Sequence, residues 1–203
     1  MEPVRVEEIL DLEAYEKIRD AFRREVIRQK ALRRVPVGDL ITFVFENRDT
    51  VRFQIQEMLR AERITDPAKV AEEVAVYNTL LPGEGELSAT LFIEVPDPAR
   101  IRETLELLVG IDREGCVTLT VGPHRVPGVF EKGRSREDKV SAVHYVRFPF
   151  SPEARKAFLD EAQDAFLVVD HPHYRHRQWL GEATRRALIQ DLAPGHSPVK
   201  TRG

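Results

Sequence analysis

Cysteine is almost absent from this sequence, because Cys116 is the only one. A single thiol forms no internal disulfide, and the chain lacks the several cysteines that a Cys-x-x-Cys metal site or an iron–sulfur cluster requires. We therefore expect a protein of a reducing compartment, the cytoplasm, without a cluster of its own. Because a strand is predicted directly after it, we interpret Cys116 as a small core side chain rather than a nucleophile.

Excess positive charge and long apolar runs are also missing. Lys and Arg number 31 against 34 Asp and Glu, which gives a formal net charge of −3. Nucleic-acid-binding proteins usually show a basic excess, so we expect no nucleic-acid partner. No segment approaches the roughly 18 apolar residues of a membrane span, and the N-terminal MEPVRVEEIL does not fit a signal peptide. We therefore expect no association with a membrane.

The overall composition is that of a folded protein. Of the 203 residues, 42% are hydrophobic and 32% are charged, a balance typical of globular chains. The length is within the range of one domain. We expect a single α+β domain at residues 1–193 and a flexible tail at 194–203. Within the domain, residues 1–82 are expected to form helices and one strand, and residues 83–193 the core.

Three of the predicted helices begin with a capping residue followed by proline. Asp66, Asp97 and Ser151 each precede a proline in the sequence. Such a side chain accepts a hydrogen bond from a free amide at the helix start, and proline at the first helical position has no amide to satisfy. Apolar residues at steps of three and four predict further helices at 12–32, about 47–64 and about 175–192, with the first ended by residues 35–38.

Alternating apolar residues predict the strands, and their order predicts a topology. From Leu87 onward the order is strand, helix, strand, extra strand, strand, helix, strand, which is the split β-α-β pattern of ferredoxin-like folds apart from the extra strand. The sequence thus predicts a mainly antiparallel sheet of five to six strands with helices mostly on one face, plus an N-terminal helical layer. The predicted strands are 41–45, 87–95, 117–121, 126–131, 142–150 and 165–169, and the polar segment 132–139 is expected to be a mobile loop.

The helix at 47–64 is the strongest candidate for a functional element. Its apolar stripe is accompanied by a second, basic stripe, and the residues between them suggest a helix that is covered on two sides. One interpretation is an ordinary charged surface helix. The other is an internal polar site in which Arg48 or Arg52 pairs with Glu46 or Glu57, with Gln56 nearby, and which holds an anion or a partner's carboxylate. In the second case we expect Glu57 to be largely buried and hydrogen-bonded to an arginine or a backbone amide.

Two further segments contain residues that could bind a ligand. The loop 82–86 ends at Glu86 and contains two glycines and two carboxylates. The simpler interpretation is a turn that only connects two elements, and the alternative is a cation site. The segment 171–176 holds His171, Tyr174 and two more histidines, but no His-x-x-x-His or Glu-x-x-His spacing accompanies them. We therefore predict exposed histidines at a helix start, with no metal and no cofactor.

Four blocks of the sequence resemble a known family. ENRDTVRFQIQEMLRAERI, YNTLLPGEGELSATLFIE, SAVHYVRFPF and HPHY, in this order, are similar to a bacterial family of uncharacterised proteins that is known only as a domain of unknown function. The resemblance extends from about Arg24 to Leu192. The genes of that family lie beside those for rubrerythrin and an iron–sulfur oxidoreductase, which implies a role in peroxide handling or electron transfer and a redox protein as partner.

Two functional hypotheses follow from these observations. The first is an accessory or binding protein that serves a redox partner and uses the helix at 46–63 as its contact or ligand site. The second is a small enzyme, with or without a metal, in which Glu57, Glu86 and His171 surround a shared cleft. The candidate site residues are Glu46, Arg48, Arg52, Gln56, Glu57, Glu86, His171 and Tyr174.

Overall fold

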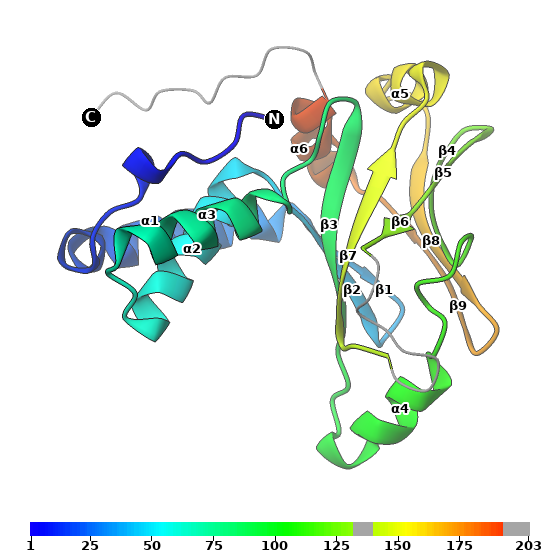
Figure 1. Cartoon of the computed structure of the whole chain (residues 1–203). Coiled ribbons are helices and arrows are strands. Elements are labelled where there is room, and N and C mark those ends of the chain that lie inside the picture. The colour runs from blue at the N-terminus through cyan, green and yellow to red at the C-terminus, as the bar shows by residue number, and fades with distance from the viewer. Residues whose placement is uncertain (132–139, 193–203) are drawn as a thin grey trace.

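The protein consists of a helical layer and two β-sheets that face one another (Figure 1). The computed structural model describes residues 1–131 and 140–192. A short 3-10 helix η1 (Val6–Glu8) precedes the three helices of the helical layer, which are α1 (Leu12–Ala31), α2 (Arg48–Glu62) and α3 (Pro67–Asn78). None of the helices in the described ranges is long and apolar enough to cross a bilayer.

All strand pairs are antiparallel. The first sheet has the order β1 (Arg34–Val37), β2 (Ile41–Phe45), β3 (Glu86–Ile93), β7 (Val143–Pro149) and β6 (Val129–Phe130). The second sheet has the order β5 (His124–Pro127), β4 (Val117–Val121), β8 (Ala165–His171) and β9 (Tyr174–Trp179). The main core lies between the two sheets, where fully buried side chains from both meet, among them Phe43, Phe45, Leu91, Leu119 and Leu167.

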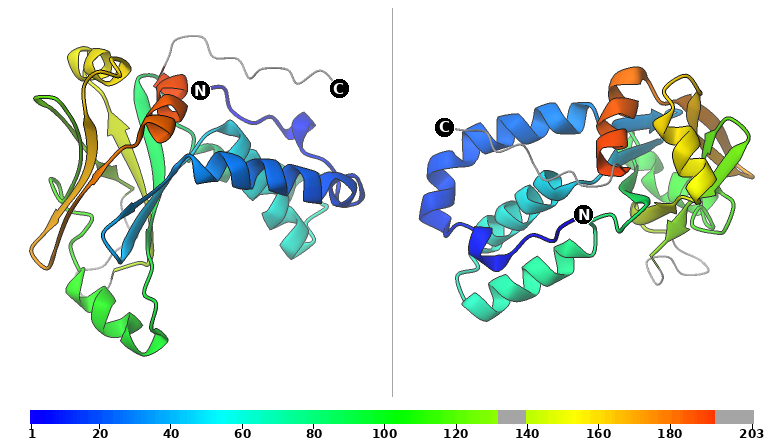
Figure 2. Two further views of the ribbon diagram at one scale, coloured as in Figure 1. Left: turned by 180° about the vertical axis from the view of Figure 1, so that it is seen from behind. Right: turned by 90° about the horizontal axis from the view of Figure 1, so that it is seen from above.

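The remaining helices close the two ends of this sandwich (Figures 1 and 2). The 3-10 helix η2 (Pro98–Arg100) leads into α4 (Ile101–Leu107) at one end, and α5 (Pro152–Leu159) and α6 (Glu182–Leu192) lie at the other. The predicted caps are present: the side chains of Asp66, Asp97 and Ser151 each accept a hydrogen bond from a backbone amide two or three residues later.

The α+β class and the antiparallel pairing are confirmed, but the strands form two sheets rather than one. Strands β3 and β7 pair as a split β-α-β unit requires, whereas β4 and β8 pair with each other in the second sheet. Helices α4 and α5 contain 7 and 8 residues, too few to cover the apolar face of β3 and its neighbours. A second sheet with its own apolar face covers it instead, as in β-sandwiches.

Two edge strands were not predicted. Residues 35–38 were expected only to end the first helix, but residues 34–37 form the edge strand β1, in which Val35 and Val37 point into the core and Pro36 is exposed. Residues 174–179, expected to begin the last helix, form the edge strand β9, whose side chains are mostly exposed and polar and therefore show little apolar pattern. The predicted mobile loop at 132–139 and the predicted tail at 194–203 lie outside the described residues.

Candidate binding site between α1 and α2

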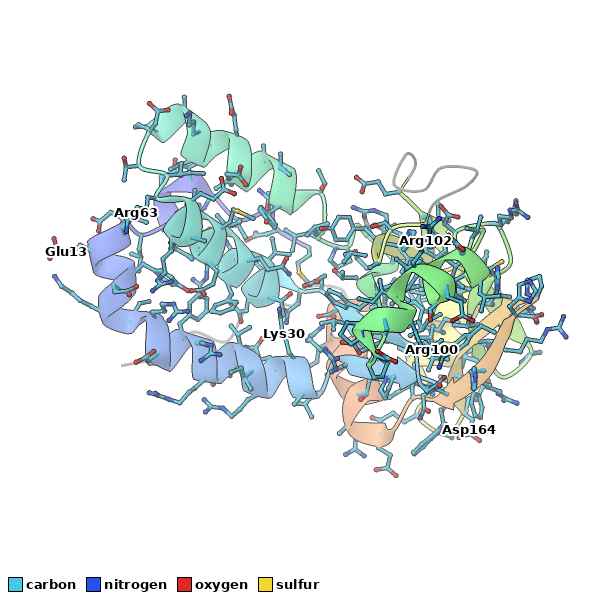
Figure 3. The ribbon with its side chains drawn as sticks, turned by 90° about the horizontal axis from the view of Figure 1, so that it is seen from below. Glu13, Lys30, Arg63, Arg100, Arg102 and Asp164 are labelled. Carbon is cyan, nitrogen blue, oxygen red and sulfur yellow. The ribbon has the colours of Figure 1, made fainter. Side chains whose placement is uncertain are left out.

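Helix α2 lies in the middle of the helical layer, between α1 and α3 (Figures 2 and 3). Its start is capped by Asn47, whose side chain accepts a hydrogen bond from the Thr50 amide at 2.9 Å. Figure 3 shows Glu13 of α1 and Arg63 after α2 at the same end of the layer, so the two helices run antiparallel. The apolar stripe of α2 packs in a second core with residues of α3 and of the N-terminal segment, among them Val4, Val51, Ile55, Leu59 and Val74. The helix is therefore covered on two sides, as its residue pattern suggested.

A pocket opens between α2, the N-terminal segment and α1. Its volume is about 200 Å³, and its walls are mainly apolar. Arg52 is the only cation among the side chains that line it, which are Glu8, Leu10, Ile18, Ala21, Phe22, Arg52 and Gln56. We call this site the Arg52 pocket.

The guanidinium group of Arg52 is held by weak contacts. Its central carbon lies 4.8 Å from the centre of the Phe22 ring, a cation–π arrangement. Its Nη2 atom lies 3.6 Å from Oδ1 of Asp49, beyond hydrogen-bond distance, and Asp49 also accepts a hydrogen bond from Gln29 at 3.1 Å. The Nε atom is buried and has no hydrogen-bond partner. Arg52 therefore has donor capacity that the protein itself leaves unused.

Arg48, one helical turn earlier, has a buried Nε atom without a hydrogen-bond partner as well, but its terminal Nη2 atom is paired. It donates to the Glu8 carboxylate and to the carbonyl oxygen of Pro3. Glu8 also accepts a hydrogen bond from the Arg5 amide at 2.9 Å. This amide and the Arg48 charge hold the pKa of Glu8 below its ordinary value, against the opposing effect of burial. The Glu8–Arg48 pair is thus neutral as a unit, and Arg52 supplies the positive charge of the pocket.

Gln56 forms the inner wall of the Arg52 pocket by fixing the N-terminal segment to α2. Its side chain is buried and binds both backbone groups of Leu10: the Leu10 amide donates to Oε1 at 2.7 Å, and Nε2 donates to the Leu10 carbonyl at 3.1 Å. Both ends of the Gln56 amide are occupied, so this residue positions the wall and has a structural role there.

Glu57 pairs with an arginine, but not with Arg48 or Arg52. Arg19 of α1 donates two hydrogen bonds to its carboxylate, at 2.7 and 2.8 Å, and the hydroxyl of buried Tyr15 donates a third at 2.7 Å. The Arg19 hydrogen bonds, and less so that of Tyr15, lower the pKa of Glu57 although partial burial opposes them. The Glu57 side chain is 28% exposed, less buried than expected. Its contacts join α1 to α2.

Glu46 is buried without an arginine partner. Its carboxylate accepts hydrogen bonds from the hydroxyls of Thr50, at 2.5 Å, and Thr90, at 2.7 Å, and from the Gln54 amide at 3.2 and 3.3 Å. These donors come from α2 and from β3, so Glu46 links the helical layer to the first sheet. It does not line the Arg52 pocket.

Glu86, at the start of β3, is held by neighbours in the first sheet and its entry loop. It accepts a hydrogen bond from the Gly83 amide at 2.7 Å and pairs with Arg147 of β7. These contacts close the turn, which agrees with the simpler interpretation of this loop.

His171 and Tyr174 lie in the second sheet and contact backbone groups. His171 is buried, and its Nε2 atom lies 3.0 Å from the carbonyl oxygen of Val109. The prediction of an exposed histidine was therefore wrong for this residue. The Tyr174 hydroxyl donates to the Val37 carbonyl at 2.7 Å and accepts from the Leu40 amide at 2.9 Å. In the described part of the chain, no three His, Cys, Asp or Glu side chains are grouped so that they could hold a metal ion.

The Arg52 pocket contains residues that the sequence did not single out. Glu8 and Leu10 belong to an N-terminal segment for which no helix or strand was predicted, and Ile18 and Phe22 lie in the predicted helix 12–32, which contributed no candidate site residue. The one sequence feature that could have indicated the pocket is Phe22, because an aromatic ring that packs against an arginine-bearing helix often forms a cation–π contact.

Of the comparisons with known proteins, one gives a family and none gives an activity. A family model described as "Protein of unknown function (DUF3501)" matches residues 3–192. A crystal structure of a novel protein of unknown function from Burkholderia pseudomallei is similar at a TM-score of 0.87 and 32% sequence identity, over 95% of this chain and 100% of that one. No curated protein matches the chain.

Proposed function

This chain belongs to the DUF3501 family of proteins of unknown function, and we propose that it is a binding or accessory protein that receives a partner's carboxylate at the Arg52 pocket. The observation that carries the proposal is the state of Arg52, whose buried Nε has no acceptor and whose nearest carboxylate oxygen lies 3.6 Å away. A buried donor left without a partner costs about 1–3 kcal/mol. The Arg52 side chain as a whole is 34% exposed, so its outer guanidinium nitrogens can donate to a carboxylate that enters the pocket, and arginine is suited to bind a carboxylate through two donors.

A redox protein of the cytoplasm is the partner that we propose. The support comes from the resemblance to a family whose genes neighbour those of rubrerythrin and an iron–sulfur oxidoreductase, and from the single cysteine, which leaves the chain without a cluster of its own. The role is therefore that of an accessory to an electron carrier.

The geometry gives the enzyme hypothesis less support. Glu57, Glu86 and His171 lie on α2, β3 and β8, and each has its own structural partners. None of the three lines the Arg52 pocket. A general acid or base must reach the same substrate as its companions, and this arrangement supplies no such common site.

Binding of the full-length protein to purified rubrerythrin from the same organism, measured by biolayer interferometry, tests the proposal. We expect Arg52→Gln to weaken binding by about tenfold or more, because hydrogen bonds between charged groups contribute about 1.5–3 kcal/mol. Arg60→Gln is the matched control, since Arg60 lies two turns along α2 and pairs with Glu16 outside the pocket. Equal affinities of wild type and Arg52→Gln would contradict the site, and no binding of any variant would contradict this partner.

A further inference from the structure

The size of the Arg52 pocket limits what it can hold. Its volume of about 200 Å³ is below the roughly 300–1,000 Å³ typical of sites for cofactors and other small-molecule ligands. A cavity of this size suits one side chain of a partner protein, the usual anchor of a protein–protein contact.

The surface around the pocket is apolar, as a protein contact requires. Leu10 and Ile18, which line the cavity, are 38% and 45% exposed. Val6, two residues before Glu8 in η1, is 39% exposed. A small molecule enclosed in the pocket would leave these side chains in water, whereas a polypeptide that continues beyond the pocket would cover them.

The charge of the pocket selects an anion. Arg52 is the only cation among the lining residues, and the one lining carboxylate, Glu8, is neutralised by Arg48. The pocket therefore matches a ligand with a single negative charge. Among the described residues, the carboxylate that competes with such a ligand for Arg52 is that of Asp49, at 3.6 Å.

The Arg52 cation and the apolar wall border a space the size of one residue, so the ligand should carry a negative charge and an apolar group close together. A C-terminal residue carries a carboxylate and a side chain on the same Cα atom, whereas an internal Asp or Glu offers a carboxylate without an apolar group beside it. We propose that the Arg52 pocket binds the C-terminal residue of a partner chain, with its aliphatic side chain against Phe22 and Ile18 and its α-carboxylate on Arg52. This inference rests on the proposed function and names the part of the partner that is recognised.

Fluorescence polarisation with short synthetic peptides tests it. The probe is a fluorescein-labelled Gly-Ser-Gly-Ala-Leu peptide with a free C-terminal carboxylate, and its matched control is the same peptide with a C-terminal amide. We expect the amide to bind at least about tenfold more weakly, because it lacks the charge that Arg52 recognises. A third peptide, amidated and with an internal Asp before the Leu, tests whether a side-chain carboxylate can replace the terminal one.

Two protein variants separate the charge from the apolar wall. Arg52→Gln is expected to abolish the preference for the free acid over the amide, and Arg60→Gln to preserve it. Ala21→Trp adds bulk at an exposed position that lines the pocket and is expected to reduce binding of the free acid while Arg52 stays in place. Circular dichroism checks that each variant is folded.

Three results would overturn the inference. They are equal binding of the acid and amide peptides, equal binding of the internal-Asp peptide and the free acid, and saturable binding of 4-methylpentanoate with no binding of any peptide. In each case a weaker interaction of Arg52→Gln with the whole partner would still uphold the proposed function. Loss of that effect, instead, would contradict the proposed function itself.

Discussion

The buried and half-buried charges in the helical layer are balanced in different ways. The Glu46 carboxylate accepts hydrogen bonds from neutral donors, and the Glu57 carboxylate accepts them from Arg19 and Tyr15. The Arg52 guanidinium contacts an aromatic ring and lies beyond hydrogen-bond distance of a carboxylate. Burial of a charge is costly unless hydrogen bonds compensate for it. The first two residues are fully compensated by side chains from neighbouring elements, which is typical of structural roles. Arg52 is compensated only in part, and this difference supports its proposed role in binding.

Glu57 is expected to make stability depend on pH. Because the folded protein lowers the pKa of Glu57, its contribution to the free energy of unfolding is present above the ordinary value of 4.5 and is lost as the pH falls through the lowered value. We expect Glu57→Gln to cost about 1–2 kcal/mol near neutral pH, allowing for the partial exposure of the pair, and much less in acid. Urea denaturation at a series of pH values measures this difference.

Glu16→Gln is the control for that series. Glu16 pairs with Arg60, and its side chain is 54% exposed, so its removal should cost much less stability than the removal of the Glu57 carboxylate. A Glu57→Gln effect that stays undiminished below the lowered pKa would show that the loss comes from packing and not from charge.

At the scale of elements, the turn between β1 and β2 is tied to β9 by close contact. Gly38 has a φ of +73°, and a Cβ atom there would lie 2.3 Å from the Tyr174 hydroxyl oxygen. That hydroxyl is fixed by hydrogen bonds to Val37 and Leu40 on either side of the turn. Glycine therefore allows the first sheet to approach the edge strand of the second, and Tyr174 has a structural role.

Gly38→Ala is expected to destabilise the protein more than Gly85→Ala does. Both glycines have a φ near +72°, so both substitutions incur the backbone cost of about 1–2 kcal/mol, but nothing lies within 4 Å of a Cβ at Gly85. The additional loss at Gly38, about 1–3 kcal/mol, measures the clash with Tyr174. Thermal unfolding of the two variants gives the comparison, and equal losses would show that the turn can move away from β9.

At the scale of the whole molecule, the helical layer is joined to the sandwich by a buried ion pair. Arg33, just after α1, donates hydrogen bonds to the Asp191 carboxylate of α6 at 2.6 and 3.0 Å, and both side chains are only 6% exposed. The contact joins residues 158 positions apart in the sequence. Together with Glu46, it connects the N-terminal helices to the β-rich part of the protein.

Removal of one partner of this pair should greatly lower the free energy of unfolding, whereas replacement of both partners should lower it only slightly. Asp191→Ala leaves a buried, unpaired Arg33, at an expected cost of about 3–5 kcal/mol. The double variant Arg33→Met with Asp191→Leu replaces the pair by apolar side chains and should recover most of that loss. Chemical denaturation of both variants tests this prediction. If the double variant is as unstable as Asp191→Ala, the ion pair itself stabilises the fold, and apolar side chains do not replace it.

Local features of the sequence predicted much of the fold. Helix starts at Asp66 and Ser151, and strands such as 117–121, depend on residues that are near one another in the chain, so capping chemistry and alternation identify them directly. Edge strand β9 was missed because its exposed side chains show little apolar alternation. Edge strand β1 was missed because its alternation is limited to Val35 and Val37 in a four-residue segment that contains a proline. The backbone of a neighbouring strand stabilises both.

The sequence by itself determined the family, the α+β class and the polar character of α2, including an acid at position 57 that requires a partner. Only the tertiary structure decided that this partner is Arg19, that β4 and β8 form a second sheet, and that Arg52 faces a pocket lined by the N-terminal segment. The physical reason is that helix and strand signals arise from neighbours along the chain. The partner of a charge and the wall of a pocket come instead from packing between segments that are distant in the sequence.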